Sequence, residues 1–145
     1  CENFQNRAYI TQTITLTLDE FPDVFNVPRP PFQSVTSIKY IDTDGAQQTL
    51  SSSVYEVDDQ SEPGRIALAY SQSWPSIRGD INSVEVIYVA GYGDEADDVP
   101  ERVKAAIKLL VGHLYEHREM VSEMTLKEVP FSVKSLLGVD RLGLV

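Results

Sequence analysis

The sequence predicts an α+β fold, in which a β-rich region is followed by one long helix and a short C-terminal helix. Two observations support this fold class. Residues 10–90 contain short apolar stretches separated by turn-forming residues, which is typical of an antiparallel sheet or a small sandwich. Beyond this region the apolar residues recur every three or four positions, as in an amphipathic helix. The 145 residues suit a single domain with a β-rich region at 10–93, a helix at 94–124 and a tail at 125–145.

The first 32 residues are expected to contain a helix end and two strands. The chain starts at Cys1 without a methionine, so we expect a processed or trimmed N-terminus, with residues 1–5 as the last turn of a helix. Residues 10–18 alternate in polarity, as a half-buried strand does. The side chains on its apolar face are Ile10, Gln12, Ile14, Leu16 and Leu18. Residues 19–27 are expected to form a loop and a short edge strand, and the prolines of 28–32 exclude a helix there.

Residues 34–50 are typical of a β-hairpin. A β-rich stretch runs from Val35 to Ile41, the pair Asp44-Gly45 favours a turn, and residues 47–50 return. The letters DTDG also resemble the start of a calcium-binding loop. The required third oxygen ligand and the later glutamate are replaced by Ala46 and Ser52, so we interpret DTDG as a turn.

Three further strands are expected at 54–57, 65–70 and 83–90. The loop between the last two contains Trp74, which either covers the edge of the core or binds a ligand; the first alternative is the commoner role of such a residue. The same loop contains an Arg-Gly-Asp triplet at 78–80, which we interpret as a turn.

One long helix is expected at about 98–121. Asp98 and Glu101 match a D-x-x-E capping box, with Val99 at the first helical position and Pro100 in the first turn. The apolar stripe consists of Val99, Val103, Ala106, Ile107, Leu110 and Leu114. About 23 residues give a rod of roughly 34 Å. Because this rod is long for a small domain, we expect part of it to pack on something other than its own sheet.

A short helix at about 130–138 is expected in the tail, which is apolar and has only one acidic residue after residue 128. In a chain with a net charge of −10, such a tail either docks on a partner or folds back on its own helix. Both alternatives are open at this point.

The stretch HLYEH at 113–117 matches the H-x-x-E-H pattern of a zinc peptidase class. His113 and His117 share a helix face, but a zinc hydrolase needs a third protein ligand. The chain has no other histidine, and no second helix is arranged to bring back a carboxylate. We therefore interpret HLYEH as helix surface and predict no metal and no cofactor.

The charge and the composition exclude several function classes. A net charge of −10 argues against a nucleic-acid clamp, which needs clustered Lys and Arg. The acidic surface could instead repel DNA that slides past, or simply keep the protein soluble. No G-x-S-x-G elbow, phosphate-binding loop or dinucleotide fingerprint occurs, and no apolar run is long enough to cross a membrane.

An ordered set of short motifs resembles the head–tail connector (adaptor, or head-completion) proteins of long-tailed bacteriophages and gene transfer agents. The resemblance covers nearly the whole chain. Its motifs are NRAYITQT, LDEFP, PRPPFQSVTSIKYIDTDG, YEVD, EPGRI, SWP, YVAGYGD, VPERVKAAIKLLVGHLYEHR and PFSVKSLL.

The resemblance implies a structural virion protein with a helical adaptor core, into which the β-region is inserted. Such proteins form a ring under the twelve-fold portal of the DNA-filled head, extend its channel and support the stopper or tail terminator. The expected partners are therefore the portal protein, the stopper or tail-terminator protein and further copies of this chain. Genomic DNA would pass through the channel without sequence-specific binding. The protein would be located at the neck of the virion, and it would assemble in the host cytoplasm.

Two sets of site residues follow as expectations. Portal binding is assigned to the tail residues Phe131, Val133, Leu136, Leu137, Arg141 and Leu142. The acidic residues expected to face the DNA channel are Asp94, Glu95, Asp97 and Asp98. A rival role for the acidic set is to cap the helix N-terminus. The alternative functions are a small soluble β-rich module that binds a ligand or protein around Trp74, and a zinc hydrolase at HLYEH.

Overall fold

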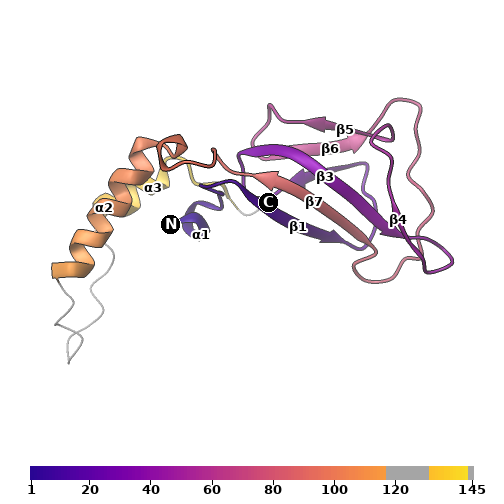
Figure 1. Cartoon of the computed structure of the whole chain (residues 1–145), viewed down its shortest axis with the longest axis horizontal. Coiled ribbons are helices and arrows are strands. Elements are labelled where there is room, and N and C mark those ends of the chain that lie inside the picture. Colours follow the sequence, from indigo (N-terminus) through magenta and orange to yellow (C-terminus); the bar gives the residue numbers. More distant parts are fainter. Residues whose placement is uncertain (117–130, 144–145) are drawn as a thin grey trace, which may run out of the picture.

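The computed structural model describes residues 1–116 and 131–143 and has an α+β architecture. Figure 1 shows a β-region at one end of the molecule and helices α2 and α3 projecting from the other end. The N-terminal helix α1 lies between the two parts. The helical segments are α1 (Glu2–Gln5), a 3-10 turn (Ala96–Asp98), α2 (Glu101–Glu116) and α3 (Phe131–Gly138).

The β-region is a small sandwich of two antiparallel sheets, which is one of the two arrangements predicted. The four-stranded sheet has the order β1-β7-β3-β4, and the three-stranded sheet has the order β2-β6-β5. The strands are β1 (Gln12–Leu18), β2 (Val24–Val27), β3 (Phe32–Ile41), β4 (Gln47–Thr49), β5 (Tyr55–Asp58), β6 (Gly64–Leu68) and β7 (Val84–Ala90).

The core lies between the two sheets. The central strand β7 alternates strictly, and its four inward residues are fully buried: Val84, Val86, Tyr88 and Ala90. The other sheet contributes Phe25, Val27 and Ile66 to the same cluster. In β1, Ile14, Leu16 and Leu18 are half-buried against it, as predicted, whereas Ile10 of the predicted face lies before β1 and is 41% exposed. Trp74 also packs on this core, with its ring stacked on Phe21 at a centroid distance of 4.7 Å.

The predicted hairpin is present as β3 and β4. The Asp42 carboxylate accepts hydrogen bonds from the backbone N–H groups of Asp44 and Ala46, and Gly45 has a φ of 86°. The left-handed backbone at Gly45 explains the need for glycine. These hydrogen bonds stabilise a turn in which Asp42 is occupied by protein donors, and the turn interpretation of DTDG is confirmed.

The start of the long helix differs from the prediction. Val99 has an extended backbone (φ −72°, ψ 132°), and α2 begins at Glu101. A residue that precedes proline is pushed out of the α region, so Val99 cannot be the first helical residue before Pro100. The capping box is formed instead by Glu95 and Asp98 around the 3-10 turn. The end predicted at residue 121 lies outside the described residues.

Helix α3 packs against α2 through a separate small cluster. Ala106 of α2 is fully buried, and Val133 and Leu137 of α3 are buried against it. Leu110 and Leu136 are half-buried at the edge of this contact. No helix within 1–116 or 131–143 is long and apolar enough to cross a membrane.

Candidate functional site

Backbone hydrogen bonds and a glycine close approach connect the helices to the β-region at a junction. The chain passes from β7 to the 3-10 turn through Gly91 and Gly93. A Cβ atom on Gly91 would lie 2.6 Å from backbone atoms of Ile10 and Thr11, and Gly91 has a φ of 140°. The Thr11 N–H donates to the Gly93 carbonyl at 2.9 Å, and the Tyr92 N–H donates to the Tyr9 carbonyl at 3.1 Å. This backbone pairing fixes where the helices leave the sheet.

A buried polar cluster on the N-terminal segment connects the junction to the C-terminal tail. Gln5 is fully buried; its Nε2 donates to the Leu137 carbonyl at 2.7 Å and its Oε1 accepts from the Tyr9 hydroxyl at 2.6 Å. Burial, together with the charge of Glu2, raises the pKa of Tyr9 to about 12. Tyr9 is therefore a neutral donor at physiological pH.

Arg7 joins three segments through one guanidinium group. Its side chain is only 9% exposed, and it forms an ion pair with Glu62 at 2.5 Å. Its Nε donates to the Asp140 carbonyl at 2.7 Å, and one terminal nitrogen donates to the Tyr92 hydroxyl at 3.4 Å. Burial lowers the pKa of Arg7, but the hydrogen bond to Glu62 and the nearby negative groups outweigh burial and raise the pKa overall. Arg7 remains charged and holds the tail against the junction.

The tail folds back over the N-terminal segment. Besides the bonds from Gln5 and Arg7, the Asn6 side chain donates to the Leu142 carbonyl at 3.1 Å, and the Leu142 N–H donates to the Gln5 carbonyl at 3.1 Å. The acceptors on the tail are mostly backbone carbonyls, so no motif in the tail sequence could have revealed this contact. Within 131–143, the alternative that the tail folds back on its own protein is the one that the structure shows.

The six residues predicted to bind a portal lie in different environments. Val133 and Leu137 are buried between α3 and α2. Leu136 and Leu142 are half-buried, and Arg141 is exposed, with its guanidinium 5.0 Å from the centre of the Phe4 ring. The backbone of Phe131 begins α3. Only Leu136, Arg141 and Leu142 thus present accessible side-chain surface among the five whose burial is described.

The four acidic residues predicted to face DNA lie together at the exposed start of the helical part. The Glu95 N–H donates to the Asp98 carboxylate at 3.0 Å, and Asp97 lies 3.9 Å from the Lys104 ammonium. Glu95 and Asp98 therefore cap the 3-10 turn that precedes α2, not the N-terminus of the long helix itself. Asp94 and Asp97 point to solvent and are available for a second role.

HLYEH falls at the described end of α2. His113 is half-buried, and His117 lies outside the described residues. No group of three or more His, Cys, Asp or Glu side chains that could hold a metal ion is found within residues 1–116 and 131–143.

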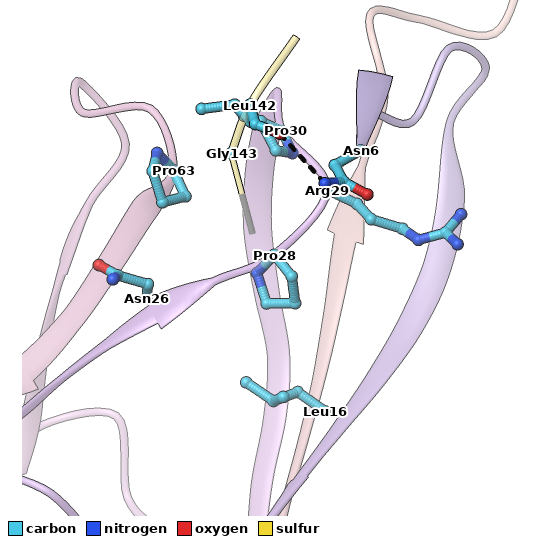
Figure 2. Close-up of a pocket in the computed structure, with 9 residues that line it drawn as sticks. All are labelled: Asn6, Leu16, Asn26, Pro28, Arg29, Pro30, Pro63, Leu142 and Gly143. Carbon is cyan, nitrogen blue, oxygen red and sulfur yellow. Dashed lines mark hydrogen bonds between the residues drawn. The ribbon is translucent and has the colours of Figure 1, made fainter. Parts of the chain in front are cut away.

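A cavity of about 400 Å³ opens between the two sheets and the junction. Figure 2 shows Asn26 and Pro63 on one side, Asn6 and Arg29 on the other, and Leu16 at the inner end. Pro28, Pro30, Leu142 and Gly143 complete its lining. The walls are apolar and the rim carries two amides, while the Arg29 side chain extends away from the other lining residues. No local pattern in the sequence indicates this cavity, because its lining comes from five separate segments.

No protein-family model matches the chain, and no curated protein matches it. Solved structures with the same fold exist in gene transfer agent particles. One is from the neck of a native GTA particle computed with C12 symmetry, with a TM-score of 0.78 and 22% identity; the match covers 99% of this chain and 76% of that chain. A second is from the neck of an empty GTA particle computed with C6 symmetry, with a TM-score of 0.77. A third is from the virion of a native gene transfer agent particle, with a TM-score of 0.75. Each is 22% identical, and each match covers 99% of this chain and 72% of that chain. At this identity the likeness establishes the shared fold.

Proposed function

We propose that this chain is a structural, non-catalytic subunit of the neck of a phage-like particle, with residues 1–145 acting as one connector domain. The observation that carries the proposal is the shared fold over 99% of the chain with proteins in the neck of gene transfer agent particles. A function that depends on shape and assembly can be retained at 22% identity, because it requires surfaces in a common arrangement rather than a set of reacting groups.

In this proposal the subunits form a ring, with a twelve-fold arrangement favoured by the C12 symmetry of one neck structure with this fold. The ring lies between a portal protein and a stopper or tail-terminator protein, and it extends the DNA channel at the neck of the virion. Assembly takes place in the host cytoplasm and needs no cofactor or membrane.

The end of the molecule formed by α3 and the tail is the proposed portal contact. Leu136, Arg141 and Leu142 would contact the portal, together with Phe131. Val133 and Leu137 would act indirectly, since they hold α3 on α2. The tail positions these side chains because Gln5, Asn6 and Arg7 hold its backbone.

The acidic turn at 94–98 is the proposed channel-facing segment. Asp94 and Asp97 are exposed, and their carboxylates would repel DNA phosphates and let the DNA move. Glu95 and Asp98 would contribute charge while they cap the turn.

The portal contact is tested with Arg141→Glu in the full-length protein. The Arg141 side chain is exposed and makes a cation–π contact with Phe4, so the variant should fold normally. We expect binding to the cognate portal, measured by biolayer interferometry, to weaken roughly tenfold or more, because an interface charge is reversed.

The matched control is Arg78→Glu, which makes the same charge change in the loop before β7, where Arg78 pairs with Asp80 on the surface. This control should bind the portal as the unaltered protein does. Equal binding by Arg141→Glu and the unaltered protein would show that the portal docks elsewhere.

A further inference from the structure

The acidic residues of this chain are unevenly distributed. Of the 22 aspartates and glutamates, none falls in residues 3–18 or 24–41, although the net charge is −10. The structure brings these two acid-free stretches together. Leu16 of the first stretch and Asn26, Pro28, Arg29 and Pro30 of the second line the cavity described above.

The surface around the cavity is therefore unlike the rest of the β-region. Its lining contains no acidic residue and one cation, Arg29, whose guanidinium donates to Asn3 Oδ1 at 3.0 Å and keeps further donors. The nearest acidic neighbour in sequence is Glu62, beside Pro63, and Glu62 is paired with Arg7. We call the surface formed by Leu16, Asn26, Pro28 and Arg29 the acid-free face.

The acid-free face also contains an open sheet edge. Within residues 1–116 and 131–143, strand β2 pairs with β6 alone and forms the edge of its sheet. The Leu68 N–H donates to the Asp23 carbonyl at 3.3 Å, and hydrogen-bonded pairs alternate along antiparallel strands. The backbone groups of Val24 and Asn26 therefore point away from β6, towards the free edge. Val24 is 53% exposed, which adds apolar surface next to the cavity.

We propose that the acid-free face is where the next copy of this chain docks in the ring. This inference rests on the proposed function. Two copies that each carry a charge of −10 repel one another wherever acidic surfaces meet, and opposed like charges at an interface cost several kcal/mol. A ring also requires a contact in which one face of a subunit meets a different face of the next. The acid-free face avoids the repulsion between acidic surfaces, and it differs from the rest of the subunit, as a ring contact requires. Arg29 would pair with an acidic group of the next copy. The cavity would accept an apolar side chain, and the edge of β2 would form backbone hydrogen bonds.

The test is the double variant Asn26→Glu with Arg29→Glu, which places two carboxylates on this face. Asn26 is exposed and lies opposite Arg65 on β6, and Arg29 loses an exposed hydrogen bond to Asn3, so at most a small decrease in melting temperature is expected. The matched control, Thr43→Glu with Arg78→Glu, makes the same change in charge at the far end of the β-region.

The number of copies bound to each portal is counted by native mass spectrometry during a titration. Copies of the unaltered protein and of the control should bind to the portal cooperatively. The Asn26→Glu, Arg29→Glu variant should bind without cooperativity, with about tenfold weaker apparent affinity at half-saturation. Cooperative filling by the variant, equal to the control, would overturn the inference and leave the proposed function intact.

A failure of the proposed function would look different. If the unaltered protein does not bind the portal, its self-association at high concentration is measured by sedimentation velocity instead. Oligomers that form with the unaltered protein and the control, but not with the Asn26→Glu, Arg29→Glu variant, would still support the inference. A sedimentation profile common to all three proteins would overturn it.

Discussion

At the residue scale, Arg7 connects the N-terminal segment, the loop before β6 and the tail through a single buried guanidinium. We expect Arg7→Met to lower the free energy of unfolding by about 2 kcal/mol, because the buried Arg7 side chain loses its ion pair with the half-exposed Glu62 and the Asp140 carbonyl loses its donor. The measurement is chemical denaturation followed by circular dichroism. The matched control is Arg65→Met, since Arg65 pairs with Asp58 at an exposed site and should contribute about 1 kcal/mol or less. Equal losses for the two variants would show that Arg7 has no special role.

Two glycines make a second residue-scale comparison. A Cβ atom on Gly93 would collide with the Asp98 carboxylate, whereas Gly112 in the middle of α2 has open space around it. We expect Gly112→Ala to raise the free energy of unfolding by roughly 0.5–1 kcal/mol, because alanine is the better helix former. Gly93→Ala should lower it, since Asp98 must leave its capping position. Thermal melts of both variants check this, and a gain in stability for Gly93→Ala would contradict the capping geometry.

At the element scale, α3 is held by very few buried side chains. Leu137 is 4% exposed and packs on Ala106, while Val139, just after the helix, is 68% exposed. Leu137→Ala should therefore cost about 2–4 kcal/mol of unfolding free energy, and Val139→Ala should change it little. Hydrogen exchange should show that the loss is local to α3 and the tail. Fast exchange spread evenly over the β-region would instead mean that α3 stabilises the whole fold.

Elements could be predicted from the sequence where one local pattern decides the structure. The β-region was predicted from short apolar stretches such as β1 and β7, whose residues alternate between buried or half-buried and more exposed positions. The hairpin was predicted from the Asp44-Gly45 turn. The start of α2 was wrong by three residues, because the restriction that Pro100 places on Val99 outweighed the capping pattern of Asp98 and Glu101.

The candidate site was less predictable for a physical reason. The tail is bound through backbone carbonyls of Leu137, Asp140 and Leu142, which every sequence possesses. The apolar tail residues were visible in the sequence, but whether Leu137 faces a partner or Ala106 depends on contacts between segments more than a hundred residues apart. The cavity is also built from distant segments.

At the scale of the whole molecule, the acidic β-region and the projecting helices suit a subunit that is repeated around a channel. The helices would reach the portal, the acidic turn at 94–98 would lie near the DNA, and the acid-free face would meet the neighbouring subunit. The portal contact and the acid-free face adjoin at Leu142, which lines the cavity. Arg141→Glu tests the portal contact, and Asn26→Glu with Arg29→Glu tests the acid-free face.

The most direct measurement is electron microscopy of the full-length protein mixed with its cognate portal. The connector role predicts a ring stacked coaxially on the portal, with α3 and the tail at the contact. Folded protein that remains separate from the portal at every concentration would contradict it.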